Sequence, residues 1–458
     1  MSISLLLADC AKAIGGELHN AGSRPYPLSA FSTDTRTITK GDTFIALTGP
    51  NHDGHLHCDA AKDAGAIALV VNHRVDCDLP QLVVPDTRIA LGIIAKLWCI
   101  EHQVPLVAVT GSNGKTTVKE MIAAILGELG DVLATSGNLN NDIGVPLTLL
   151  RLNPSHHYAV IEMGANHPGE IGYLSKLALP DIGVITNISS AHLEGFGSLE
   201  NTAAAKSEIF RGVDSSGVAI LNADDAFFGV MKEASSHCRQ LTVGMLPGAQ
   251  IRGGFIKGRF TINLKGRTIQ PELQLLGQHN RFNAVIAAAV AYSFDVSPET
   301  ICRGLESMEP VPGRLQKQVC ANGAVIINDT YNANPASTKA ALDVLAEQEG
   351  NRVFVFGDMK ELGDDAIALH ADIGNYARKV GIRHFYSVGS LAAHAANAFG
   401  ESGISCLTKE DLLEQLHTHC NEFGVFLVKG SRGAQMEDVV DGLMALDDNG
   451  AEAGVTLS

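Results

Sequence analysis

The clearest pattern of apolar and polar residues lies between residues 104 and 129. Four apolar residues, Leu106 to Val109, predict a buried strand, and two glycines then indicate a tight loop. From Val118 onward, apolar side chains recur at i, i+3, i+4, i+7 and i+8, which predicts a helix with one face packed on a sheet. This order predicts a phosphate cradle, because loop N–H groups and the helix dipole face the anion. The residues of the cradle are Gly111, Ser112, Asn113, Gly114, Lys115, Thr116 and Thr117.

The spacing of this loop departs from the general phosphate-loop motif. That motif has four residues between its glycines, which would place a glycine where Val109 stands. Only two residues separate Gly111 from Gly114. An ordinary strand-to-helix turn that ends in a solvated lysine is the alternative. The flanking strand and helix favour the phosphate site, in which Thr116 is placed to hold Mg²⁺ through its hydroxyl.

Other short apolar runs predict strands that alternate with helices. These runs lie at residues 41–47, 67–71, 158–162, 182–186, 324–328, 352–356, 384–388 and 424–428. Such alternation predicts an α/β protein, and 458 residues suit about three domains. We expect a small α/β N-terminal domain (1–104), a central P-loop domain with a parallel sheet (105–313) and a C-terminal, Rossmann-like open sheet (314–458). A hinge is expected just before Arg314, where two prolines and a glycine occur.

Two local patterns give more specific predictions. A helix with apolar positions Ile89, Ile93, Leu97 and Ile100 should lead to the central strand. Residues 247–276 predict β-hairpins, with turns at Gly253-Gly254 and at Lys265-Gly266.

Composition and charge exclude several classes of protein. The formal net charge is −16, which argues against a nucleic-acid partner. No run of about 18 apolar residues occurs, so no membrane span is expected, and the N-terminus lacks the basic start of a signal peptide. Nine cysteines are scattered without a CxxC pair, which is typical of reduced thiols. We therefore expect a cytoplasmic protein.

Polar side chains follow two of the predicted central strands. Glu162 ends the strand at 158–162, and His192 lies in the loop after the strand at 182–186. Ligands of parallel α/β sheets bind beyond the carboxyl ends of the strands, where Lys115 also lies. An exposed glutamate and a structural histidine are the alternatives. The matching positions favour Mg²⁺ binding by Glu162 and a metal or phosphate role for His192.

Lys206 lies on a helix that Ser198 is placed to cap, and it has no carboxylate at i±3 or i±4. On a stripe of small and apolar residues its pKa should fall, and the neutral amine can then react. The alternative is an alkyl stem on the core with the ammonium in water. The residues alone favour that alternative.

Further polar loops are candidates for ligand binding. In the first domain they contain Ser32, Thr33, Arg36, Asp53 and His55. Hydroxyls beside an arginine can hold a diphosphate or a uracil edge, but turn chemistry explains them equally well. The histidines and cysteine at 52–58 match no zinc spacing. Polar residues also open a helix or follow strands at Asn138, Asn280, Asn283, Asp329, Asn332, Lys429 and Arg432.

In their order along the chain, these motifs resemble the Mur ligases, the ATP-dependent amide-bond ligases of bacterial cell-wall precursor synthesis. The central motifs are the phosphate loop, Glu162-Met-Gly164, the His192 loop, Ala204-Ala-Lys206 and His279-Asn-Arg-Phe-Asn283. The last segment is similar to the family member that adds D-alanyl-D-alanine to UDP-N-acetylmuramoyl-tripeptide. Its motifs are Asp329-Thr-Tyr-Asn-Ala-Asn-Pro335, Gly357-Asp-Met-Lys-Glu-Leu-Gly363 and Lys429-Gly-Ser-Arg-Gly433. The Asp-Asn-Pro-Arg motif of the member that adds the third residue is absent.

The resemblance implies specific roles. Lys115 would contact the β- and γ-phosphates of ATP, and Lys206 would be carbamylated by CO₂, which reverses the interpretation from the residues alone. Two Mg²⁺ ions would be held by Thr116, Glu162, His192 and the Lys206 carbamate. The nucleotide would also meet His279, Asn280, Asn283 and Arg314. UDP-precursor binding would involve Ser32, Thr33, Arg36, Asp53, His55 and Asn138. The dipeptide and domain closure would involve Asp329, Asn332, Lys429 and Arg432.

The implied reaction is phosphorylation of the tripeptide carboxylate by ATP, followed by attack of the D-alanyl-D-alanine amine on the acyl phosphate. Two alternatives stay open at this point. Folylpolyglutamate synthase shares the phosphate loop but needs no UDP site, and a nucleotide-dependent switch needs no amide substrate. We expect a monomer. The third residue of the tripeptide, lysine or diaminopimelate, is left open.

Overall fold

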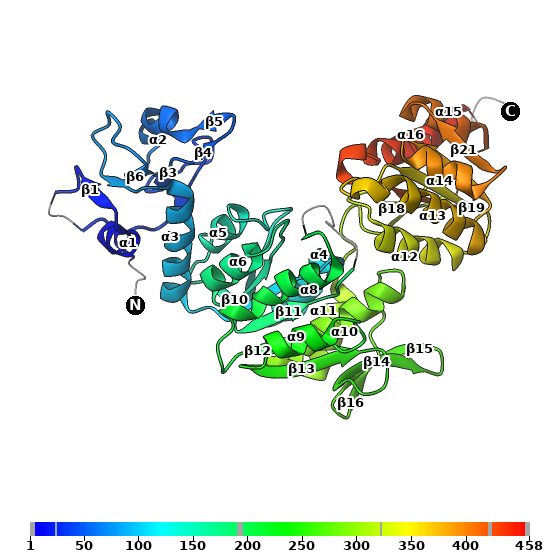
Figure 1. Ribbon diagram of the computed structural model, residues 1–458, viewed down its shortest axis with the longest axis horizontal. Helices are drawn as coiled ribbons and strands as arrows, with labels where there is room; N and C mark the ends of the chain where they lie inside the picture. Colours follow the sequence, from blue (N-terminus) through cyan, green and yellow to red (C-terminus); the bar gives the residue numbers. More distant parts are fainter. Residues whose placement is uncertain (1–4, 23–24, 190–195, 321–322, 420–423, 454–458) are drawn as a thin grey trace.

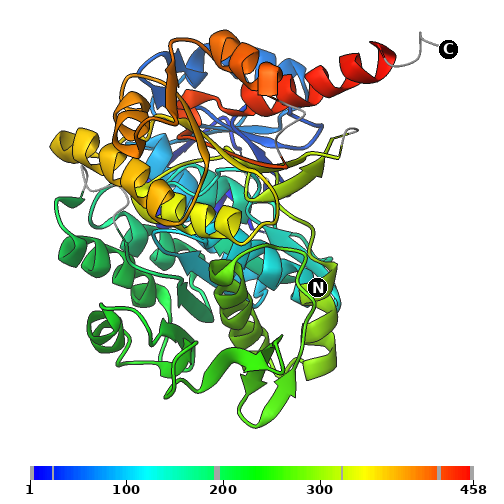
Figure 2. The same cartoon turned by 90° about the vertical axis from the view of Figure 1, so that its right-hand side faces the viewer.

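The computed structural model describes residues 5–22, 25–189, 196–320, 323–419 and 424–453. Its strands form three large sheets that follow one another along the sequence (Figure 1). The N-terminal and C-terminal units lie at opposite ends of the molecule, with the central unit between them. The view turned by 90° shows both outer units above the central one (Figure 2). The predicted α/β class with three sheet-containing parts is confirmed.

The N-terminal sheet has the order β1-β7-β6-β3-β2, with β1 antiparallel to β7 and the other neighbours parallel. Its strands are β1 (Glu17–His19), β2 (Phe31–Ser32), β3 (Thr43–Ile45), β6 (Ala68–Val71) and β7 (Gln81–Val83). A separate ribbon pairs β4 (Thr48–Gly49) with β5 (His52–Asp53). The helices are α1 (Leu7–Ile14), α2 (Cys58–Asp63) and α3 (Thr87–His102). The two predicted strands of this segment are thus present as β3 and β6.

Helix α3 connects the N-terminal unit to the central unit as predicted, but the four apolar positions named from the sequence do not mark its buried face. Ile89 is 54 % exposed and Ile100 is 46 % exposed. The fully buried apolar side chains are instead Ala90, Leu91, Ile94, Ala95 and Trp98. Helix α3 packs on β6 and also on α5 (Gly144–Leu149) and α6 (Glu170–Ala178) of the central unit. Because two units cover this helix, a single-stripe pattern does not identify its buried face.

The central sheet has the order β16-β15-β14-β13-β12-β11-β8-β10-β9. Neighbours from β9 to β14 are parallel, whereas β15 and β16 are antiparallel. The strands are β8 (Leu106–Thr110), β9 (Asp131–Ala134), β10 (His156–Glu162), β11 (Ile182–Ile185), β12 (Val218–Asn222), β13 (Arg239–Gly244), β14 (Ile251–Ile256), β15 (Arg259–Leu264) and β16 (Arg267–Ile269). Further helices are α4 (Lys115–Gly127), α8 (Leu199–Ser207), α9 (Phe228–Ala234), α10 (Gln278–Ser293) and α11 (Pro298–Ser307).

Helices cover both faces of the central sheet, which explains why its strands read as continuous apolar runs. Alternate residues of β8 belong to two different cores: Leu106 and Ala108 face one, and Val107 and Val109 face the other. The second core contains the buried faces of α4, α10 and α11. This double cover holds β8 rigidly, so the loop after it starts from a fixed point.

One of the two predicted hairpin turns is wrong. Lys265 and Gly266 do form a turn, with φ of 49° and 103°. Gly253 and Gly254, however, lie inside β14, and the turn into β15 follows Ile256. A Cβ at Gly253 would lie 2.4 Å from the Met245 sulfur. Close packing therefore explains glycine at position 253, and a turn does not.

The C-terminal sheet has the order β17-β18-β22-β19-β20-β21, parallel except for the edge strand β17. The strands are β17 (Gln316–Val319), β18 (Val325–Asp329), β19 (Arg352–Gly357), β20 (His384–Val388), β21 (Gly403–Cys406) and β22 (Val425–Lys429). The helices are α12 (Pro335–Ala346), α13 (Ala366–Lys379), α14 (Ala392–Phe399), α15 (Lys409–His419) and α16 (Glu437–Ala453). The four predicted strands are present, and β17 and β21 are additional. Among the described residues, no helix is long and apolar enough to cross a membrane.

Candidate active site

A cavity of about 770 Å³ lies at the carboxyl ends of the central strands and is bordered by the C-terminal unit. Such a position is the expected ligand site of a parallel α/β sheet. Most of the residues predicted from the sequence line this cavity: Ser112, Asn113, Gly114, Lys115, Thr116, Thr117, Asn138, Glu162, Lys206, His279, Asn280, Asn283, Arg314, Asp329, Asn332 and Lys429. Arg88 of α3 also lines it, so all three units contribute.

The two glycines of the phosphate loop cannot be replaced without displacing other groups. Gly111 has φ of 151°, and a Cβ there would lie 1.9 Å from the Thr186 hydroxyl oxygen. Gly114 has φ of 80°, and a Cβ there would lie 2.7 Å from the Asn283 side-chain oxygen. The short spacing between these glycines therefore fits a loop that packs tightly on β11 and α10.

Lys115 begins α4 directly after this loop, and its ammonium donates to the Gly111 carbonyl at 2.9 Å. Burial lowers the pKa of Lys115, with Glu162 opposing this shift and Arg314 adding to it. An ammonium so placed, at the N-terminus of a helix and beside loop N–H groups, is arranged to receive an anion.

Glu162 is held by two neutral donors at the end of β10. The Thr116 hydroxyl donates to Glu162 Oε2 at 2.8 Å, and the Asn140 amide donates to Oε1 at 2.8 Å. Glu162 is 3 % exposed, and no lysine or arginine in the described part of the chain pairs with it directly. A buried carboxylate needs a compensating charge, and a hydroxyl beside it adds a second hard oxygen ligand. These residues therefore fit a Mg²⁺ ion.

Lys206 is buried on α8, with 1 % of the residue exposed. The interpretation that its ammonium reaches water is wrong. Burial, with Lys115 adding to the effect, lowers the pKa of Lys206 to about 7. Its Nζ lies 5.6 Å from the centre of the Phe196 ring, and no hydrogen-bond acceptor is found for it in the described ranges. A substantial fraction of the amine is thus neutral near pH 7, and the side chain lines the cavity, as a reactive lysine requires.

Residues of α10 and the hinge lie on the other side of the phosphate loop. The Asn283 amide donates to Asn280 Oδ1 at 3.1 Å, and both residues are buried. Arg314 donates to the Thr116 hydroxyl oxygen at 2.9 Å and lies 4.1 Å from the centre of the Tyr331 ring. The Arg314 Nε is buried and has no hydrogen-bond partner within the described residues. Arg314 thus connects the C-terminal unit to the proposed metal ligand Thr116.

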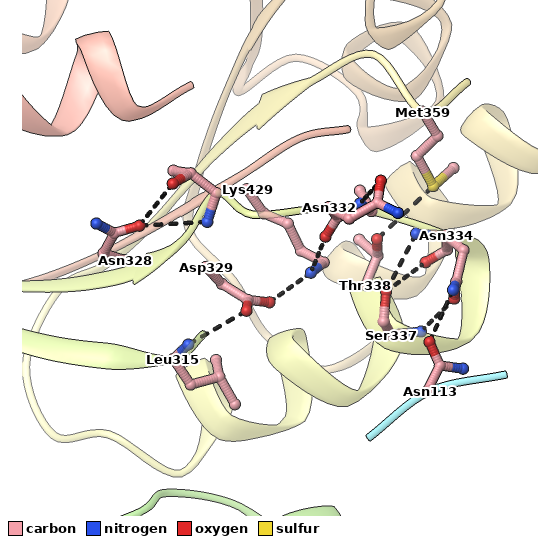
Figure 3. A network of polar contacts seen from close by, with 12 residues as sticks. Asn113, Leu315, Asn328, Asp329, Asn332, Asn334, Ser337, Thr338, Met359 and Lys429 are labelled. Atoms are coloured by element: carbon pink, nitrogen blue, oxygen red, sulfur yellow. Dashed lines mark hydrogen bonds and ion pairs between the residues drawn. The ribbon is translucent and has the colours of Figure 1, made fainter. Parts of the chain in front are cut away.

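The C-terminal side of the cavity is a network of polar contacts (Figure 3). Lys429, which is buried, forms an ion pair with Asp329 and donates to the Asn332 carbonyl at 3.0 Å. Asn334 points toward the phosphate loop, and its amide donates to Asn113 Oδ1 at 2.7 Å. Burial lowers the pKa of His279, and the nearby Asp329 opposes this shift. The two units therefore meet through polar groups that border the cavity.

Several predicted residues lie outside this cavity. Arg432 has a side chain that is 70 % exposed and pairs with Glu437 at 2.9 Å. Gly111 does not line the cavity but accepts a hydrogen bond from the Lys115 ammonium, and His192 lies outside the described residues. Of the residues assigned to the UDP precursor, Asn138 alone lines the cavity; Ser32, Thr33, Arg36, Asp53 and His55 belong to the N-terminal unit.

The contacts of the N-terminal candidates are mostly local. Arg36 pairs with Asp34 at 2.6 Å, and the Ser32 hydroxyl donates to the Asp34 carbonyl at 2.9 Å. His55 is buried; its Nδ1 bonds to Asp53 at 2.6 Å and its Nε2 accepts the Asn72 N–H at 3.0 Å. Since both ring nitrogens are engaged, His55 shapes the loop and leaves no ring nitrogen for a ligand. We therefore take His55 out of the candidate ligand-binding residues.

Sequence reasoning missed Asn140 and Asn334. Asn140 lies in the polar loop around Asn138, so the loop was identified although its contact with Glu162 was not. Asn334 precedes Pro335 and caps α12 by accepting the Ser337 N–H at 2.9 Å. An asparagine before a proline is a typical helix start, so its role as a cap follows from the sequence. Its bond to Asn113 does not, because the two residues are 221 positions apart.

Cysteine and metal-ligand patterns add no second site. No disulfide bond joins any two of the eight cysteines in the described part of the chain. No group of three or more His, Cys, Asp and Glu side chains that could hold a metal ion occurs among the described residues.

Comparison with known proteins supports the same interpretation. Residues 109–291 match the Mur ligase middle domain, and residues 313–432 match the glutamate ligase domain of Mur ligases. A UDP-N-acetylmuramoyl-tripeptide–D-alanyl-D-alanine ligase of Escherichia coli is 42% identical, over 98% of this chain and 99% of that protein. A solved MurF structure from Acinetobacter baumannii has a TM-score of 0.89 and 36% identity, covering 97% of this chain and 100% of the other.

A second solved structure contains a bound nucleotide. The MurF ligase of Thermotoga maritima, solved in complex with ADP, has a TM-score of 0.82 and 26% identity, covering 92% of this chain and 98% of the other. The phosphate loop and the cavity residues suit phosphoryl transfer from ATP, and the family matches identify the class as the ATP-dependent amide-bond ligases. This chain belongs to the Mur ligase family.

Proposed function

We propose that this chain is the ligase that joins D-alanyl-D-alanine to UDP-N-acetylmuramoyl-tripeptide at the expense of ATP, in peptidoglycan precursor synthesis. The observation that carries the proposal is one cavity that combines the phosphate loop, buried Glu162, low-pKa Lys206 and the Asp329–Lys429 pair. The similarity to D-alanyl-D-alanine ligases extends over nearly the whole chain and supports the choice of amine.

The three units receive separate tasks in this proposal. Residues 1–104 bind the UDP part of the precursor, with Ser32, Thr33 and Arg36 as candidates, and Asn138 at the cavity. Residues 105–313 bind ATP. Residues 314–458 bring the dipeptide through Asp329, Asn332 and Lys429, and they complete the ATP site. A cavity lined by all three units supports this division.

The chemistry proceeds in two steps. A carboxylate oxygen of the tripeptide attacks the γ-phosphorus of ATP, the bond to the bridging β–γ oxygen breaks, and ADP leaves. The amine of D-alanyl-D-alanine, having lost a proton, then attacks the acyl carbon, and phosphate leaves with the carboxylate oxygen. Lys115 neutralises charge on the transferring group, and the cavity residues position both reactants and exclude water from the acyl phosphate.

Two bound groups belong to this proposal. Thr116 and Glu162 would hold one Mg²⁺ and His192 would help to hold a second, and the ions would neutralise charge on the phosphates. Lys206 would react with CO₂ to give a carbamate that supports a second ion. The neutral amine and the absence of a described acceptor at its Nζ support this assignment.

Carbamylation of Lys206 should depend on pH with a predictable sign. The pKa of Lys206 is lowered from 10.5 to about 7, so the reactive neutral amine dominates above pH 7. Well below pH 7 the neutral fraction falls about tenfold for each pH unit. Trapping of ¹³C-labelled CO₂ on the protein, read by mass spectrometry, should therefore decrease steeply below pH 7. Equal labelling of the Lys206→Ala variant would show that the label is elsewhere.

The contact between Asn334 and Asn113 gives a test of how the C-terminal unit completes the ATP site. Asn334→Ala should lower stability by about 1 kcal/mol through the lost helix cap. It should also weaken ADP binding about fivefold, because a hydrogen bond to the phosphate loop is lost.

Ser297→Ala is the matched control for Asn334→Ala. Ser297 caps α11 in the same way, by accepting the Thr300 N–H, and it is also followed by a proline. Its hydroxyl donates to the Thr300 hydroxyl oxygen of the same helix, whereas the Asn334 amide donates to the phosphate loop. Thermal unfolding should show a similar loss in both variants, and calorimetry should show weaker ADP binding in Asn334→Ala alone. Equal ADP affinities would mean that the Asn334–Asn113 contact does not serve the nucleotide site.

Amine-dependent phosphate release separates the proposed function from its alternatives. The protein, ATP, Mg²⁺ and UDP-N-acetylmuramoyl-tripeptide should release phosphate quickly with D-alanyl-D-alanine and slowly with glutamate or without amine. A folylpolyglutamate synthase would instead need a folate and glutamate, and a nucleotide switch would release phosphate without regard to the amine. Tripeptides with lysine and with diaminopimelate should be compared in the same assay.

A further inference from the structure

A further buried lysine, Lys119, lies one turn after Lys115 on α4 and outside the cavity. It is 2 % exposed. Its Nζ donates to the Thr135 carbonyl at 2.6 Å and pairs with Glu120 Oε1 at 2.6 Å. Burying an ammonium is costly unless its hydrogen bonds are satisfied. The bonds of this lysine therefore specify where the chain at Thr135 must lie.

Thr135 is the point at which the ladder between β9 and β10 ends. Its N–H donates to the Val160 carbonyl at 3.1 Å, which continues the parallel register. The next bond of a parallel ladder would join the Glu162 N–H to the Thr135 carbonyl. Here the Glu162 N–H donates instead to the Thr135 hydroxyl oxygen at 2.9 Å. The Thr135 carbonyl accepts its hydrogen bond from the Lys119 ammonium. The lysine and the hydroxyl together replace one ladder bond.

This exchange lets the chain leave the sheet at Thr135 while the Glu162 backbone stays fixed. The loop that departs here returns at Asn140, whose amide donates to the Glu162 carboxylate at 2.8 Å. The Asn140 carbonyl also accepts the Gly164 N–H at 2.8 Å. Lys119 thus anchors one end of a loop whose other end orients the candidate metal ligand.

We propose that Lys119 is a positioning residue for the metal site: through Thr135 it fixes the backbone of Glu162 and the loop that carries Asn140. The proposal rests on the proposed function, since Glu162 is assigned to Mg²⁺ there. Lys119 does not touch the reacting atoms. Its effect is to hold the Glu162 carboxylate where Thr116 can share an ion with it.

The test measures metal binding directly. Mn²⁺ replaces Mg²⁺, and its binding to the enzyme–ADP complex is followed by electron paramagnetic resonance. Lys119→Met should raise the Mn²⁺ dissociation constant about tenfold and leave ADP affinity without metal unchanged. Thr135→Val removes the hydroxyl that accepts the Glu162 N–H and should have a similar effect. Because both act through one connection, the double variant should be no worse than the more affected single variant.

Lys409→Met is the matched control. Lys409 makes the same two kinds of bond, to the Gln435 carbonyl at 2.7 Å and to Asp438 at 2.6 Å, within the C-terminal unit. It should leave Mn²⁺ binding unchanged. If Lys119→Met and Thr135→Val both bind Mn²⁺ within twofold of the parent and only lower the unfolding temperature, Lys119 is merely structural and the proposal is wrong. Metal binding to the ADP complex needs no amine, so this result is independent of the substrate assignment.

Discussion

Lys115→Ala should abolish ATP-dependent phosphate release, by about a thousandfold or more, and leave binding of the UDP precursor unchanged. The ammonium lies at the N-terminus of α4, beside the loop whose glycines cannot carry a Cβ. Preorganised charge at a transferring phosphoryl group is often the largest single contribution to catalysis. The UDP part is assigned to the N-terminal unit, so its affinity should not depend on Lys115. Phosphate release and calorimetric titration with the precursor measure the two effects separately.

Lys339→Ala is a suitable control for this variant. Lys339 lies on α12 and pairs with Asp372, so it tests the loss of a lysine from a neighbouring helix. It should keep nearly full activity. Near-normal turnover of Lys115→Ala would end the assignment of the loop to the γ-phosphate.

Lys206→Ala should be nearly inactive, and a small carboxylate such as formate should restore part of the activity. The variant removes a buried amine whose pKa is about 7, and it leaves space where the carbamate would lie. A carboxylate that enters this space supplies the same anionic oxygens. Phosphate release is measured with increasing formate, at constant ionic strength set with chloride.

The rescue distinguishes a chemical role of Lys206 from a packing role. Lys206→Met fills more of the space and should be equally inactive but less responsive to formate. An active Lys206→Ala variant would return this lysine to a structural role. Rescue by chloride to the same extent would show that the added salt acts in another way.

Local patterns predicted those site residues that follow directly from a strand or begin a helix. Lys115 and Glu162 each come just after an apolar run, and parallel strands place such residues at one edge of the sheet. Asn334 followed by Pro335 is likewise a typical helix start, and α12 begins there. These predictions succeed because the cause of the position lies within a few residues.

Contacts between distant segments could not be predicted in this way. Lys206 is buried, its Nζ lies 5.6 Å from the centre of the Phe196 ring, and the charge of Lys115 helps to lower its pKa, whereas the residues alone favoured a solvated ammonium. The exposed Ile89 is a second case, because α3 is covered by two units and not by one sheet. The family resemblance corrected the first of these and had no bearing on the second.

In the N-terminal unit, the sequence pattern did not distinguish between two interpretations. The sequence of residues 32–55 was equally consistent with turns and with a ligand site. The structure shows that Asp34 engages Arg36 and that Asp53 engages His55. The Arg36 side chain is nevertheless exposed, so it can exchange its carboxylate partner for a diphosphate. Measuring the affinity of Arg36 variants for the UDP precursor therefore tests the assignment of the UDP contacts.

The central claim is that the γ-phosphate is transferred to a carboxylate which D-alanyl-D-alanine then attacks. The most direct measurement uses UDP-N-acetylmuramoyl-tripeptide with ¹⁸O in its terminal carboxylate, together with ATP, Mg²⁺ and D-alanyl-D-alanine. Mass spectrometry should show a UDP-pentapeptide and phosphate that carries one ¹⁸O atom from the carboxylate. Phosphate without ¹⁸O, or a nucleotide product without the added dipeptide, would contradict the account.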